Sequence, residues 1–195
     1  MKHGKYTDFA KKRNRGFFLM TLAVIAGTAI GSFNYGAGDI PFLHQYFSPV
    51  YSGNTLTDVF GNTFMSLALF SAGAFIMGMF ALGQPFGVLL LMYRGYGIGI
   101  SASMMYYTMG FGAVPAVMIL LLPKAVCTVI VSMLAVRELM RSSCMIFRYI
   151  TGRGGDEPER RFFRLYCIKF AVIILISALI SAADALMNYL FAKLV

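Results

Sequence analysis

The chain alternates long apolar runs with short blocks of lysine and arginine, and this alternation constrains its fold more than any other feature. A helix that crosses a bilayer needs about 20 apolar residues, and such runs occur at about residues 17–35, 63–82, 85–107, 114–136 and 169–191. Hydrophobic residues make up 58% of the chain, more than a soluble fold of this size can bury. We therefore predict an all-α, polytopic transmembrane bundle of about five helices, forming a single membrane domain over residues 1–195.

The positive charges predict how the chain is threaded through the membrane, because loops rich in lysine and arginine stay in the cytoplasm. Segment 36–62 contains neither residue and is predicted to be an extracytoplasmic loop. One basic block precedes the first apolar run and the other fills a predicted cytoplasmic segment, 137–164. Four crossings place both blocks on the same side, and a fifth helix then leaves the N-terminus inside and the C-terminus outside. The positive residues of the two blocks are Lys2, Lys5, Lys11, Lys12, Arg13 and Arg15, then Arg137, Arg141, Arg148, Arg153, Arg160, Arg161 and Arg164.

This placement of charge also bears on partners and processing. The net charge of +9 does not indicate nucleic-acid binding, because the basic residues stand between apolar runs instead of covering one surface. The expected partner is the lipid bilayer of the cell membrane. A basic start followed by an apolar run also begins a signal peptide, but this run is long for one and no clear cleavage site follows it. We interpret it as a first helix that stays in the protein.

Glycine and proline inside the apolar runs predict how the helices pack and where they bend. Glycines four residues apart share one helix face and let two backbones approach closely. The density of glycine at 95–99 predicts that the third helix lies centrally in the bundle. Pro123, inside the fourth run, predicts a kink because it removes a backbone hydrogen bond. The glycine pairs at this spacing are Gly27 with Gly31, Gly83 with Gly87, and Gly95 with Gly99.

Three charged residues, Arg94, Lys124 and Asp184, fall inside the predicted spans. A charge at mid-bilayer costs about 2.5–3.5 kcal/mol on insertion scales, so such residues seldom face lipid. Three arrangements are open. Lys124 forms a structural ion pair with Asp184, which is expected at a similar depth; or side chains, Arg94 first, reach toward an interface; or all three line a polar path for an ion or substrate.

No catalytic, cofactor or metal motif accompanies these charges. The histidines His3 and His44 are far apart, and the cysteines Cys127, Cys144 and Cys167 lack metal-ligand spacing. We therefore expect a protein that is not an enzyme and carries no cofactor or metal. Segment 36–62 is instead aromatic, which is typical either of a loop lying on the membrane surface or of a docking surface for an extracytoplasmic partner. Its candidate docking residues are Phe42, Tyr46, Phe47 and Tyr51.

Several short motifs follow one another in an order that resembles the stage II sporulation protein M family. The resemblance covers most of the chain, and its specific motifs span 83–124. The chain departs from the family at Lys124, where the family tends toward an amide or a histidine. The motifs are Gly83-Gln84-Pro85, Arg94-Gly95-Tyr96-Gly97-Ile98-Gly99, Gly110-Phe111-Gly112 and Leu122-Pro123.

The resemblance implies a non-enzymatic scaffold of the septal membrane that organises extracytoplasmic peptidoglycan hydrolases, an amidase/endopeptidase and a lytic transglycosylase, during endospore engulfment. The alternative is a membrane component of a transporter, such as an ABC-type exporter, with a polar path at Arg94, Lys124 and Asp184. The oligomeric state is open, a homo-oligomer included.

Overall fold

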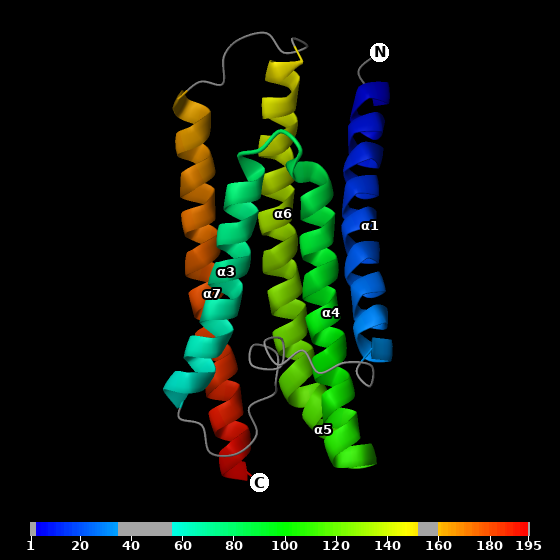
Figure 1. Cartoon of the computed structure of the whole chain (residues 1–195), viewed down its shortest axis with the longest axis vertical. Coiled ribbons are helices and arrows are strands. Elements are labelled where there is room, and N and C mark those ends of the chain that lie inside the picture. Colours follow the sequence, from blue (N-terminus) through cyan, green and yellow to red (C-terminus); the bar gives the residue numbers. More distant parts are fainter. Residues whose placement is uncertain (1–2, 35–55, 152–159, 195) are drawn as a thin grey trace.

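Every regular element is helical in the computed structural model, which describes residues 3–34, 56–151 and 160–194 (Figure 1). Five of its helical segments are long and apolar enough to cross a membrane. The predicted all-α transmembrane bundle of five helices is therefore confirmed, and the chain is a multi-pass membrane protein. The long helices are α1 (His3–Phe33), α3 (Leu56–Gly78), α4 (Gly83–Met109), α6 (Leu122–Ile150) and α7 (Arg160–Leu194).

The helices run up and down through one bundle (Figure 1). Helices α1, α4 and α7 run in one direction, and α3 and α6 run in the other. As a result α1 begins at the end of the bundle where α6 finishes and α7 begins, while α7 finishes at the opposite end. The two basic stretches thus share one end of the bundle, as the charge pattern requires. Which end faces the cytoplasm stays a prediction.

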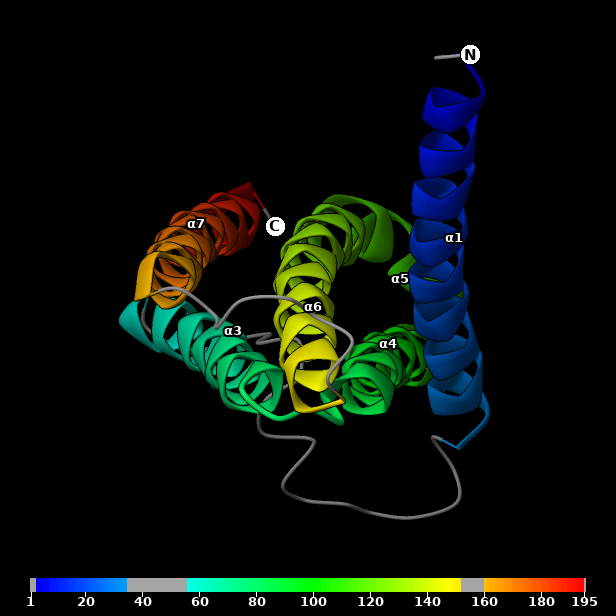
Figure 2. The ribbon, with the colours of Figure 1, turned by 90° about the horizontal axis from the view of Figure 1, so that it is seen from above.

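The middle of the bundle is shared by two helices. Figure 2 shows α6 between α7, α3 and α4, while α4 joins α1 to the rest. The expected central position of the glycine-rich third helix therefore holds only in part. Side chains between the helices are fully buried, Leu91 and Leu139 among them. Large apolar side chains such as Ile25 and Leu179 point outward and are more than half exposed, which is the surface that lipid covers.

Glycine makes the contact between α1 and α4 unusually close. A Cβ added at Gly27 would overlap the carbonyl oxygen of Met92, and one added at Gly95 would overlap the carbonyl oxygen of Val24. The same holds one turn further along for the next glycine of each helix, so the two pairs interlock. Backbone packs on backbone here, as the spacing predicts. The second pair of interlocking glycines is Gly31 and Gly99.

The tight turn between α3 and α4 is held by hydrogen bonds from two other helices. The hydroxyl of Tyr166 on α7 donates to the carbonyl oxygen of Phe75 at 2.9 Å, near the end of α3. The hydroxyl of Ser143 on α6 donates to the carbonyl oxygen of Ala81 in the turn at 3.0 Å. The first bond satisfies a carbonyl of the last turn of α3, and the second satisfies a carbonyl of the connecting turn itself. The turn is thereby held against α6 and α7.

Most helix bounds extend beyond the sequence-based ranges, and the end of α3 is an exception. α3 begins at Leu56, inside the expected loop 36–62, and ends at Gly78, because Met79–Leu82 form the turn. α6 continues through the first part of the expected cytoplasmic segment, to Ile150, and α7 already begins at Arg160. Hydropathy finds only the part of a helix that lies in hydrocarbon, whereas a helix continues into water until a breaker stops it.

The irregularity expected at Pro123 lies just before this residue. Pro123 occupies the first turn of α6, where a missing N–H costs no hydrogen bond. The five residues before α6 form a π-helical segment, η3 (Val117–Leu121). This segment follows η2 (Gly110–Gly112) and α5 (Ala113–Ala116). A proline ring clashes with the carbonyl four residues earlier, and a wider π turn relieves that clash. The predicted distortion is thus present but is displaced toward the start of the span.

Candidate functional site within the membrane

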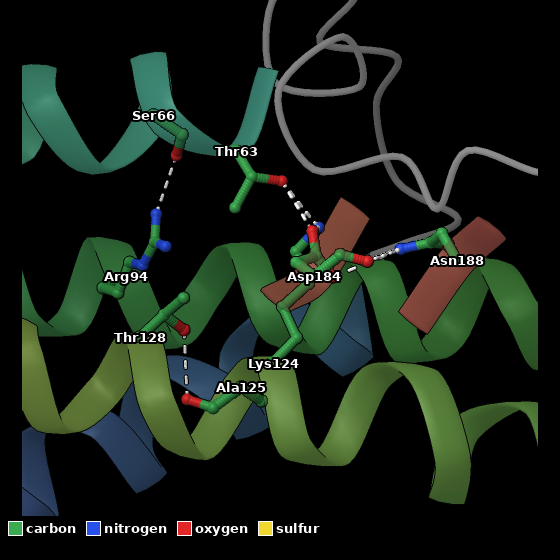
Figure 3. Close-up of polar contacts among 8 residues, drawn as sticks. All are labelled: Thr63, Ser66, Arg94, Lys124, Ala125, Thr128, Asp184 and Asn188. Carbon is green, nitrogen blue, oxygen red and sulfur yellow. Dashed lines mark hydrogen bonds and ion pairs between the residues drawn. The ribbon is translucent and has the colours of Figure 1, made fainter. Parts of the chain in front are cut away.

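Asp184 on α7 is the centre of a polar cluster inside the bundle (Figure 3). Its Oδ2 lies 2.7 Å from the Lys124 ammonium on α6 and accepts a hydrogen bond of 2.7 Å from the hydroxyl of Thr63 on α3. Lys124 also donates to the Thr63 hydroxyl oxygen, at 3.1 Å. The other carboxylate oxygen accepts a 3.2 Å hydrogen bond from the side-chain amide of Asn188, one turn further along α7. Three helices are therefore joined through one carboxylate.

The cluster lies well inside the apolar part of the bundle. Asp184 precedes the end of its apolar span at Leu190 by six residues, roughly 9 Å at 1.5 Å per residue. Thr63 follows the start of its span at Leu56 by seven residues, roughly 10 Å. Asp184 is buried, whereas the Lys124 side chain is 34% exposed. The carboxylate is thus shielded, and the ammonium lies at the edge of the cluster.

Of the three arrangements left open by the sequence, pairing of Lys124 with Asp184 is confirmed. Opposite charges that are 2.7 Å apart cancel, and Thr63 and Asn188 add one hydrogen bond to each carboxylate oxygen. Such bonds offset the desolvation cost of an ion pair, and removal of one partner exposes the full cost. Chemically the cluster is a neutral, hydrogen-bonded junction between α3, α6 and α7.

Arg94 on α4 is a second buried cation, placed deeper in the bundle. It lies eleven residues after Gly83, roughly 16 Å along α4. Its Nη1 donates to the hydroxyl of Ser66 on α3 at 2.8 Å, and the residue is only 5% exposed. The side chain contacts α3 inside the bundle, so the arrangement in which Arg94 reaches toward an interface is not the one observed. Ser66 and Thr63 share one face of α3, which therefore contacts both charged groups.

Sequence reasoning missed an ion pair at the other end of α6 and α7. The Lys169 ammonium lies 2.7 Å from Glu138 Oε2. This pair is more exposed, at 41% for the lysine side chain and 20% for the glutamate. The signal was present, since Glu138 is the one acid between two arginines and Lys169 is the one cation at the start of the fifth run. The hydropathy pattern does not show which face of either helix points toward the other, so the contact between Glu138 and Lys169 was not predicted.

The family-motif residues occupy packing positions. Gly83 adjoins Met77 and Ser143, and Gly95 and Gly99 lie in the α1–α4 contact. Pro85 lies in the first turn of α4, where a proline fits. Pro123 directly precedes Lys124, so the helix irregularity lies next to the charge cluster.

Two further expectations concern other parts of the chain. The candidate docking residues lie outside the described residues; they are Phe42, Tyr46, Phe47 and Tyr51. In the described ranges no three histidine, cysteine or acidic residues come together in a group that could hold a metal ion.

Comparison with protein-family models, with curated proteins and with solved structures finds no match to this chain. The class of multi-pass membrane helix bundle therefore rests on the fold, and a more particular role rests on the residues themselves.

Proposed function

We propose that the protein is a non-enzymatic membrane scaffold that organises extracytoplasmic peptidoglycan hydrolases, the role implied by its resemblance to the stage II sporulation protein M family. The observation that carries the proposal is the Lys124–Asp184 contact of 2.7 Å. The carboxylate at its centre is occupied by Lys124, Thr63 and Asn188. Charges that are bound to one another between helices suit a fixed frame. A scaffold needs such a frame, since it presents a surface and performs no chemistry.

The surface presented to hydrolases would be the aromatic loop 36–62, on the side opposite the basic blocks. Aromatic side chains supply much of the binding energy at protein interfaces because each buries a large area. Septal location and a role in engulfment belong to the same proposal and depend on the source cell forming spores.

Replacement of the loop aromatics tests this role. The variant carries serine at 42, 46, 47 and 51, and the matched control is Tyr107→Ser with Phe111→Ser, exposed aromatics near the same end of the bundle. Membranes are solubilised, the tagged protein is purified, and bound peptidoglycan-hydrolase activity is measured on cell-wall substrate. We expect the loop variant to lose this activity and the control to keep it, with equal amounts of inserted protein. Retention of hydrolase activity by the loop variant would exclude the proposal.

A transporter component is the second candidate, and the buried charges favour it. Ionisable groups within a membrane often mark ion or substrate paths, and Arg94 and the Asp184 cluster are linked through one face of α3. In this case the double variant Lys124→Gln with Asp184→Asn abolishes flux in proteoliposomes while the bundle stays folded. If the double variant only regains stability that each single change loses, the pair is structural.

A further inference from the structure

The outward-facing stripe of α6 changes from aliphatic to basic part of the way along the helix. Residues three and four apart share one face of a helix, and a series of exposed residues follows the outward face of α6. Aliphatic side chains suit lipid hydrocarbon and arginines suit headgroups, so the change between Leu134 and Arg137 fits a boundary between the two beside α6. In order along the helix, the exposed residues are Val126, Ile130, Leu134, Arg137, Arg141 and Arg148.

Arg137 and Arg141 lie closer to the membrane centre than the turn between α3 and α4. The hydrogen bond from Ser143 to the Ala81 carbonyl places Ser143 level with that turn, and α6 continues past it (Figure 1). At 1.5 Å per residue, Arg141 lies roughly 3 Å and Arg137 roughly 9 Å below Ser143. The turn itself is apolar, since Leu82 is 69% exposed. The backbone of both arginines therefore lies at a level where the neighbouring surface of the turn is apolar.

In the part of the chain that the structure describes, no carboxylate pairs with these two arginines. The nearby carboxylate of Glu138 is bonded to Lys169 at 2.7 Å. Neither Arg137 nor Arg141 forms an ion pair within residues 3–34, 56–151 and 160–194. An arginine keeps its charge in such a setting, and its planar fork matches two oxygens of a phosphate. A phosphate group would therefore give both arginines a partner of matching charge and shape.

We propose that Arg137 and Arg141 bind the phosphate of an anionic phospholipid in the leaflet at this end of the bundle. One stripe then holds the whole lipid: the arginines contact the headgroup, and Ile130 and Leu134 lie against the acyl chain. A free phosphate ion has no tail and gains nothing from the aliphatic part of the stripe. The assignment holds for a scaffold and for a transporter alike, since it uses neither the loop nor the buried charges.

The test measures binding of fluorescent phosphatidylglycerol, with fluorescent phosphatidylcholine as the neutral comparison, to the full chain in detergent micelles. A basic residue near a membrane surface contributes about fivefold to the affinity for an anionic lipid, so Arg137→Gln with Arg141→Gln should weaken phosphatidylglycerol binding about 25-fold. The control is Arg148→Gln, which removes the same charge from the same stripe but lies beyond the turn. It should change the affinity by less than about twofold.

The outcomes separate the lipid from other causes. Restored binding in Arg137→Lys with Arg141→Lys would show that charge carries the effect, and helical circular dichroism shows that each variant is folded. If the glutamine pair is misfolded, the single variants, each expected to lose about fivefold, replace it. The proposal is overturned if phosphatidylglycerol binds the variants as it binds the wild type, or if phosphatidylcholine binding falls equally. It is also overturned if inorganic phosphate displaces the lipid better than chloride at equal ionic strength, because a free anion would then occupy the site.

Discussion

The contact between α1 and α4 and the contact between α6 and α7 hold the bundle together by different means. α1 and α4 run in the same sense, cross at an angle (Figure 2) and touch through glycine on both sides, with carbonyl oxygens where side chains would otherwise be. α6 and α7 run antiparallel and carry an ion pair toward each end, both at 2.7 Å. The α1–α4 contact depends on shape, because any added side-chain atom would push the two helices apart. In the α6–α7 contact, opposite charges determine which residues meet.

The two ion pairs of α6 and α7 also fix how far one helix slides along the other. α6 supplies the lysine of one pair and the glutamate of the other, about four helical turns or roughly 21 Å apart. A slide by one turn would separate both pairs at once. Reversed polarity at the two ends therefore specifies register, a use of buried charge that is better attested than a gain in stability.

The largest effect is expected from filling the α1–α4 contact. Gly95→Ala places a methyl group against the Val24 carbonyl, and overpacking of this kind costs about 3 kcal/mol. Titration with sodium dodecyl sulfate measures the free energy of unfolding. The control is Gly73→Ala on α3, where a Cβ meets nothing within 4 Å and the change should be within about 0.5 kcal/mol. Equal losses in the two variants would contradict the difference in packing.

Asp184→Asn should produce the next largest loss. It leaves the Lys124 ammonium without its anion, at a cost of about 2 kcal/mol, which is reduced because the lysine is 34% exposed. Adding Lys124→Gln should recover most of this loss, and a double-mutant cycle gives the coupling energy. Losses that simply add would show that the two charges do not act together.

Ser66→Ala tests how strongly Arg94 depends on α3. Loss of a neutral partner of a charged donor should cost about 1 kcal/mol. Ser132→Ala is the control, since Ser132 is a buried serine that donates to the carbonyl of Thr128 on its own helix at 2.7 Å. Its loss should be about half as large. The reverse order of the two losses would show that Ser66 does not secure Arg94.

Lys169→Gln should have the smallest effect. The pair with Glu138 is the more exposed of the two, so its loss costs less than about 1 kcal/mol. Salt screens exposed pairs more than buried ones. The effect of Lys169→Gln should therefore shrink as sodium chloride rises, while the effect of Asp184→Asn should hardly change. If the loss of unfolding free energy in Lys169→Gln did not depend on salt, the pair would behave as a buried one and the prediction would be wrong.

The sequence predicted the spans, the shared side of the basic stretches and close backbone packing at the glycine pairs, because each of these follows from composition or spacing along a single helix. Which glycine pairs meet was not predicted. The sequence also offered the Lys124–Asp184 pair as one arrangement among three. It did not predict that Arg94 meets Ser66 or that Glu138 meets Lys169. Such contacts depend on the rotation and register of two helices, and neutral serine or threonine partners leave no mark in the charge pattern.

The α1–α4 contact sets an order of events during synthesis. α1 is synthesised before α4, yet the helix on which it packs closely is completed only with Met109. Until then the glycines of α1 have no α4 backbone to pack on. A nascent chain stopped before Gly83 would hold α1 and α3 as separate spans, and α1 would find its place when α4 enters the bilayer.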